Sequence, residues 1–194
     1  MGEGKACKYL AEEILILALM AIGMHYLMTV VFNPHSPYIS IRPREWASLI
    51  AIFFYSFANS AHEMFCINMV VLLLLGFLLE QKLQEEGVFF AAATFGAFVG
   101  GLAILLFEQS SHGYYSHYYA GFSNAVYGVV GLYIWLKNSY FRRFLFILLI
   151  VVANILVSQK ADITILGHLG GLAGGILMAE SHEEESDAKK SAEE

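Results

Sequence analysis

Long apolar runs divide this chain, and most of its polar residues collect between them. A helix needs about 20 residues, at 1.5 Å each, to cross the hydrocarbon core of a bilayer. Six runs approach this length: 14–32, 64–79, 88–107, 120–136, 144–158 and 163–179. The last three are short, which is tolerated where neighbouring helices shield the helix ends. A seventh stretch, 49–57, is too short to span and is interpreted as interfacial or re-entrant. The pattern predicts an all-α, polytopic membrane protein with a six-helix transmembrane bundle.

The composition supports this prediction. Of the 194 residues, 58% are apolar and 14% are charged, whereas a soluble domain carries roughly 25% charged residues. The formal charge of −6 is concentrated in residues 180–194, which hold seven acids and two lysines. Of the 166 residues from 14 to 179, only 14 are charged, about 8%. These figures exclude a soluble globular domain and a disordered chain, and two cysteines exclude a disulfide-rich scaffold.

Basic residues indicate the orientation. With six spans, eight of the eleven Lys and Arg residues fall on the side of the termini and three on the other. Positively charged loops favour the cytoplasm, so we expect both termini to be cytoplasmic and the protein to reside in the plasma membrane. The expected organisation is a cytoplasmic segment at 1–9, a membrane domain at 10–180 and a disordered acidic cytoplasmic tail at 181–194.

Two outer connections have distinctive residues. The segment 33–60 contains Trp46 and is long for a connection in a compact protein. Connections of this length are usually functional or partly structured. The loop 108–119 is rich in Tyr and His, as is typical of an aromatic belt at the lipid headgroups. His112 and His117 lack a Cys or acidic residue to complete a metal site, so no metal and no cofactor is predicted. Nothing in the sequence indicates nucleic-acid binding or defines an oligomeric state.

Polar residues inside the predicted spans are costly and therefore informative. The second span carries Asn68, with His62 near its outer end, the fourth carries residues 121–128, and the sixth carries residues 167–175. Each has an ordinary explanation when taken alone. A membrane serine usually bonds its own helix, a histidine is often satisfied by a hydroxyl, and glycines four apart usually serve helix packing.

The spacing of these residues favours a catalytic site. Ser123, Tyr127 and Gly131 share one face of the fourth span, and His168, Gly171 and Gly175 share one face of the sixth. A glycine strip lets two backbones approach closely enough for a serine hydroxyl to reach an imidazole. The start of the fourth helix and the Asn68 amide are candidate oxyanion donors. Asp162 lies on another face from His168, so the pattern predicts a Ser–His dyad without an acid.

These motifs resemble the rhomboid family of intramembrane serine proteases, and the resemblance covers roughly residues 10–180. Gly121-Phe122-Ser123 matches the family's G-x-S motif on the fourth helix, and Gly167-His168 with Gly171 and Gly175 matches its sixth-helix motif. On the second helix, Asn68 is followed by Gly76 and Glu80 at the family's spacing. The departures are Met64 and Asn59, where the family usually has histidines, and Asn124, where it usually has glycine. His62 can replace the missing donor only if the start of its helix is irregular.

The resemblance implies an endopeptidase that cleaves transmembrane-anchored protein substrates within the bilayer. Ser123 would be the nucleophile and His168 the general base, and an acyl-enzyme would form. Ser123, Asn68 and Gly121 would position the oxyanion or the substrate, and Tyr127 would pack against the imidazole. The alternative is a rhomboid-like pseudoprotease that binds membrane-protein clients, which the departures at Met64 and Asn124 favour. A transporter is not indicated, because the predicted spans have no charged residues near the membrane midplane and the sequence has no paired inverted repeats.

Overall fold

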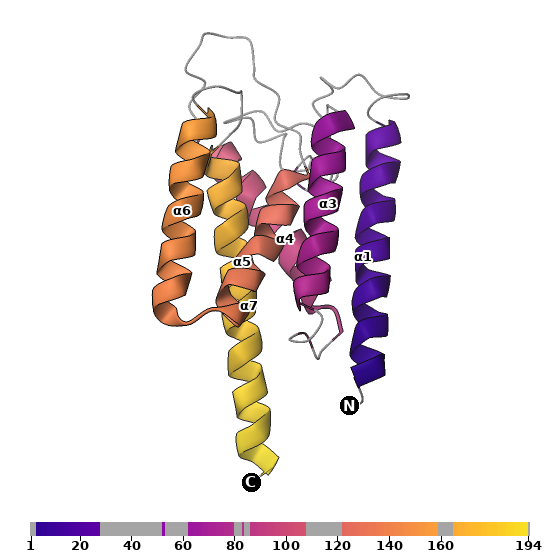
Figure 1. Cartoon of the computed structure of the whole chain (residues 1–194), viewed down its shortest axis with the longest axis vertical. Coiled ribbons are helices and arrows are strands. Elements are labelled where there is room, and N and C mark those ends of the chain that lie inside the picture. Colours follow the sequence, from indigo (N-terminus) through magenta and orange to yellow (C-terminus); the bar gives the residue numbers. More distant parts are fainter. Residues whose placement is uncertain are drawn as a thin grey trace.

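The structure is a computed structural model that describes residues 3–27, 52, 62–79, 83, 86–107, 122–158 and 165–193. The elements in these ranges are the helices α1 (Glu3–Tyr26), α3 (His62–Leu79), α4 (Val88–Phe107), α5 (Ser123–Lys137), α6 (Tyr140–Ser158) and α7 (Ile165–Glu193). They run alternately up and down, so α1 begins and α7 ends at the same end of the bundle (Figure 1). The predicted six-helix, all-α architecture is confirmed. The predicted loops 33–60 (apart from Ile52) and 108–119 lie outside the described residues.

Helices α5 and α7 approach each other at backbone contact distance. A Cβ atom added at Gly175 would overlap the Gly128 carbonyl group, and one at Gly131 would overlap the Leu172 carbonyl oxygen. Nearer the start of α7, a Cβ at Gly171 would lie 2.5 Å from the Asn124 carbonyl oxygen. Any side chain at these positions would force the two helices apart, because contacts of this length involve backbone atoms that cannot rotate away.

Helix α4 completes a three-helix centre by the same means. A Cβ at Gly96 would lie 2.5 Å from the Gly128 Cα, and one at Gly100 would lie 2.6 Å from the Gly167 carbonyl oxygen. On α7, Gly170 and Gly174 face these two α4 glycines. Small residues at such interfaces increase van der Waals contact between helices, which is the main source of attraction where no water is excluded. The glycines of α4, α5 and α7 that make these contacts therefore serve one close-packed centre.

Helix α1 is tied to α4 through a buried carboxylate. Glu13 accepts hydrogen bonds from the backbone N–H groups of Gly87, at 2.6 Å, and Phe90, at 2.8 Å. These groups lie at the start of α4, where backbone N–H groups have no partner within the helix and the helix dipole favours a negative charge. Gly87 has a φ of +90°, which glycine adopts without strain. Glu13 thus acts as the N-terminal cap of a neighbouring helix.

The outer surface of the bundle is apolar. On α6, Phe144, Leu149 and Leu156 are each more than half exposed, and on α3 Phe77 is 74% exposed. By length and composition alone, two described stretches suffice to cross a membrane, Tyr9–Tyr26 and Val88–Phe107, and Glu63–Leu79 is a shorter apolar helix. An exposed apolar surface of this extent is unfavourable in water and is typical of a lipid-facing surface.

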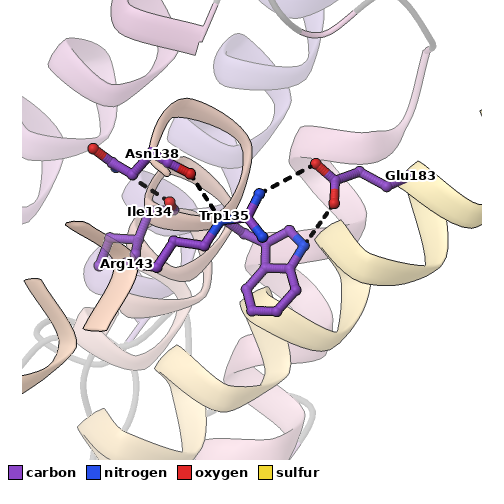
Figure 2. A network of polar contacts seen from close by, with 5 residues as sticks. All are labelled: Ile134, Trp135, Asn138, Arg143 and Glu183. Carbon is purple, nitrogen blue, oxygen red and sulfur yellow. Dashed lines mark hydrogen bonds and ion pairs between the residues drawn. The ribbon is translucent and has the colours of Figure 1, made fainter. Parts of the chain in front are cut away.

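Helix α7 continues past the membrane domain to Glu193, whereas the sequence predicts a disordered tail from residue 181. Glu183 accepts a hydrogen bond from the Trp135 indole N–H at 2.9 Å and pairs with Arg143 at 3.5 Å (Figure 2). The Arg143 guanidinium lies 4.3 Å from the Trp135 ring centre. This cluster holds the α7 extension against the end of α5 and the start of α6. Glu, Ala and Lys, which are frequent in the extension, also favour helix formation.

The glycine contacts generate a stability prediction. We expect Gly175→Ala to destabilise the bundle by roughly 1–3 kcal/mol, because its methyl group would have to displace the Gly128 backbone. Thermal unfolding in detergent measures the effect. Gly23→Ala on α1 is the matched control, because a Cβ there meets no atom within 4 Å. We expect this control to be neutral or slightly stabilising, as alanine favours a helix. Equal stability of the two variants would contradict the close-packing account.

Candidate active site

Ser123 and His168 lie within hydrogen-bond distance of each other. Ser123 is the first residue of α5 and His168 lies in the first turn of α7. Both helices begin at the same end of the bundle (Figure 1), so residues 45 positions apart meet there. The imidazole Nε2 is 3.0 Å from the Ser123 Oγ. His168 is buried, with 8% of its surface exposed, and Ser123 is half-buried.

Tyr127 and the glycine strip hold the imidazole in place. Tyr127 lies one turn after Ser123 on α5, and its ring stacks on His168 with the centroids 4.2 Å apart and the planes at 11°. This stack requires α7 to lie very close to α5. Gly171, one turn after His168, permits the close approach because it has no side chain. A Cβ at Gly171 would lie 3.2 Å from the Tyr127 Cβ. The aromatic face thereby fixes the plane of the imidazole ring.

Asn154 on α6 is a third polar residue at this site, and the sequence analysis did not identify it. Its side-chain oxygen, Oδ1, lies 2.6 Å from the His168 Nδ1. Its side-chain nitrogen, Nδ2, donates to the Ile150 carbonyl oxygen at 2.9 Å and to the Tyr127 hydroxyl at 3.0 Å. A signal was available, because an asparagine inside the apolar run 144–158 is costly in a membrane. The predicted site faces were those of the fourth and sixth spans, and Asn154 lies on the fifth.

The partners of the Asn154 amide indicate which nitrogen of His168 carries the proton. The Ile150 carbonyl oxygen can only accept a hydrogen bond, so the Asn154 Nδ2 must face it. The Asn154 Oδ1 therefore faces His168 and requires a proton on Nδ1. A neutral imidazole with its proton on Nδ1 has a lone pair on Nε2. That lone pair points at the Ser123 hydroxyl, which donates to it. With this tautomer, the Ser123 hydroxyl donates to an imidazole nitrogen that can chemically accept its proton.

The first turn of α5 supplies a backbone donor beside Ser123. The helix begins at Ser123, and its N-cap residue, Phe122, makes no side-chain capping hydrogen bond. A backbone N–H in the first turn has no carbonyl partner inside the helix, and the helix dipole is positive there. Negative charge that develops next to the Ser123 Oγ is therefore stabilised by the helix start.

The remaining predicted site residues have different surroundings. Asn68 is buried on α3, which packs against α5. The Asn124 side chain faces Gly100 and Gly167 between α4 and α7, because a Cβ at either glycine would lie within 3 Å of its amide. His62 is the first residue of α3, with its side chain outside the described part of the structure, and Gly121 also lies outside it. In the described ranges, no three His, Cys, Asp or Glu side chains gather to bind a metal ion.

Comparison with known proteins identifies the domain. A family model, the Rhomboid domain, matches residues 43–181, which is more than two thirds of the chain. The matched range contains Asn68, Ser123, Asn154 and His168. No curated protein gives a significant match to the chain.

Proposed function

The chain belongs to the rhomboid family of membrane-embedded serine proteases, and from this premise we propose that it cleaves transmembrane-anchored protein substrates through Ser123 and His168. As a member of the family it is an integral membrane protein, and the resemblance noted in the sequence is confirmed. The observation that carries the proposal is the 3.0 Å contact between the His168 Nε2 and the Ser123 Oγ. The inferred proton on Nδ1 leaves Nε2 as the acceptor in this contact.

The proposed reaction follows from the proton positions. Ser123 Oγ attacks the scissile carbonyl carbon as its proton passes to the His168 Nε2. The tetrahedral intermediate collapses, the imidazolium gives that proton to the leaving amine, and the C–N bond breaks, which leaves an acyl-enzyme. Water then attacks the ester while its proton passes to Nε2. Finally, the acid product departs as Ser123 regains the proton.

Negative charge on the attacked oxygen needs donors beside Ser123. We assign this role to the Ser123 backbone N–H and the Asn68 amide, with Gly121 positioning the adjoining backbone of the substrate. The start of α5 supports the first assignment, and the burial of Asn68 on the neighbouring helix α3 supports the second. The substrate helix must unwind locally, because its peptide bonds are otherwise shielded by their own hydrogen bonds.

The alternative is a pseudoprotease that binds membrane-protein clients. The departures at Met64 and Asn124 favour it. The contact between His168 and Ser123 opposes it, as does the position of the Asn124 side chain, which faces α4 and α7. Met64 is exposed on the surface of α3. The protease is therefore the function that these contacts support better.

We expect detergent-purified protein to be labelled by a fluorophosphonate probe at Ser123. Ser123→Ala should abolish labelling, and His168→Ala should slow it by ~10²- to 10⁴-fold, because the general base is lost. Ser139→Ala is the control, since this serine is exposed beyond the far end of α5, and it should label like the wild type. Undiminished labelling of Ser123→Ala would refute the assignment. No labelling of the wild type, together with no cleavage of any model transmembrane substrate, would favour the pseudoprotease.

We expect Asn68→Ala to lower kcat by ~10²- to 10³-fold with a much smaller change in KM, because an oxyanion donor acts mainly in the transition state. Steady-state cleavage of a fluorogenic transmembrane substrate measures both constants. Asn138→Ala is the control, because this asparagine bonds the Ile134 carbonyl oxygen at the opposite end of α5. An unchanged kcat in Asn68→Ala would remove Asn68 from the oxyanion site.

Both termini are proposed to be cytoplasmic in the plasma membrane, on the strength of the distribution of basic residues. In a protein without Cys7 and Cys66, single cysteines at Ser116→Cys and Glu184→Cys would lie on opposite sides. A membrane-impermeant maleimide applied to intact cells should label Ser116→Cys alone, and cell lysis should expose Glu184→Cys. Labelling of Glu184→Cys alone in intact cells would reverse the orientation. If both sites label only after lysis, the protein resides in an internal membrane.

A further inference from the structure

We propose that Asn154 is a positioning residue for His168, so that the site operates as a Ser–His–Asn triad rather than a dyad. This inference rests on the proposed protease function. Its starting point is the contact of 2.6 Å between the Asn154 Oδ1 and the His168 Nδ1, on the side of the imidazole opposite Ser123. The three residues come from three helices, α6, α7 and α5.

The burial pattern of α6 sets Asn154 apart. Among the α6 residues whose side chains the structure describes, Asn154 is the only one that is buried, with 5% of its surface exposed. The adjacent residues Ala153 and Ile155 are both exposed. The most buried of the described positions on this peripheral helix thus carries a polar group, and that group contacts the proposed general base. Ordinary packing of α6 would be served better by an apolar residue, because an amide is costly to bury in lipid.

The Asn154 amide is itself fixed in orientation. The Ile150 carbonyl oxygen lies one turn earlier on α6 and accepts from Nδ2, and the Tyr127 hydroxyl is nearer to Nδ2, at 3.0 Å, than to Oδ1, at 3.3 Å. Rotation of the amide by 180° would set its oxygen against the Ile150 carbonyl oxygen. Both of these oxygens can only accept, so the contact would be repulsive. The backbone of α6 therefore determines which imidazole nitrogen carries the proton.

For the reaction, Asn154 affects both the tautomer of His168 and the orientation of its ring. If the proton were on Nε2, the imidazole could not accept the Ser123 proton. Asn154 disfavours that tautomer, because its Oδ1 would then face an unprotonated Nδ1 at 2.6 Å. It also limits rotation of the ring within its stack on Tyr127. Asn154 contacts the imidazole nitrogen opposite the one that faces Ser123, so it acts through His168.

Three variants separate positioning from helix packing. Asn154→Leu keeps the branched shape of the side chain, is somewhat bulkier and has no acceptor. We expect kcat to fall by ~10²-fold with KM changed by less than about threefold, as when a base is left in the wrong tautomer. Asn154→Asp keeps an oxygen acceptor for Nδ1–H and should retain clearly more activity than Asn154→Leu. Val152→Ala truncates an exposed side chain half a turn away and should match the wild type.

A spectroscopic readout makes the test independent of proteolysis. In protein with ¹⁵N-labelled histidine, with His168→Ala as the assignment control, the wild type should show a protonated Nδ1 and an unprotonated Nε2. Asn154→Leu should shift His168 towards the Nε2–H tautomer, whereas Asn154→Asp should not. An Nε2–H tautomer in the wild type would overturn the proposal without any variant. Equal activity and an equal tautomer in Asn154→Leu and the wild type would also overturn it.

The outcomes also distinguish this proposal from the proposed function. If the wild type is not labelled at Ser123 but its tautomer depends on Asn154, the protease assignment fails while the positioning of the imidazole stands. If the wild type is active and Asn154→Leu loses activity and thermal stability with an unchanged tautomer, Asn154 is only a tie between helices. If Asn154→Leu does not fold, the wild-type tautomer and the kcat of Asn154→Asp decide the question.

Discussion

The backbone contact between α5 and α7 is the constraint on which the candidate site depends. A hydrogen bond between two short side chains on different helices requires helix axes that lie unusually close together, and only glycine permits this at Gly171 and Gly175. The stacking of Tyr127 on His168 and the contact of His168 with Ser123 both presuppose that spacing. Because α4 meets both helices through Gly96, the spacing is held from a third side. Glycine packing thus stabilises the fold and brings the residues of the proposed site together.

The site is notable for having no charged residue among its described contacts. His168 is held by an amide, a phenol ring and a hydroxyl, and all three are neutral. A carboxylate in place of Asn154 would have to be buried among lipid-facing helices at a high desolvation cost. An amide can accept from Nδ1 and still donate to its own helix, so every polar atom that it buries has a partner. A neutral orienting group therefore suits a base that lies within a membrane domain.

The sequence predicted the number of helices, their order along the chain and the helix faces that carry Ser123 and His168. These features could be predicted because apolar runs and glycine spacing are local properties of the chain. It did not predict the inward orientation of Asn154. That residue lies on a helix whose other described side chains reach the surface or are only partly buried, and only the tertiary arrangement determines which residue faces the bundle. The extension of α7 was missed for a related reason. Glu183 is ordered by Trp135 and Arg143, which are 48 and 40 residues away in the chain.

The departure from the family pattern at Asn124 has a structural counterpart in the surrounding helices. Its side chain occupies space that glycines at positions 100 and 167 leave open, with its amide within 3 Å of a Cβ at either place. An asparagine next to Ser123 is therefore accommodated between α4 and α7, about 100° around the helix from Ser123. The side of α5 that carries Ser123 and Tyr127 faces the imidazole, and the 3.0 Å contact between Ser123 and His168 is present with asparagine at position 124. The departure from the family pattern at Asn124 is compatible with the Ser123–His168 contact for this reason.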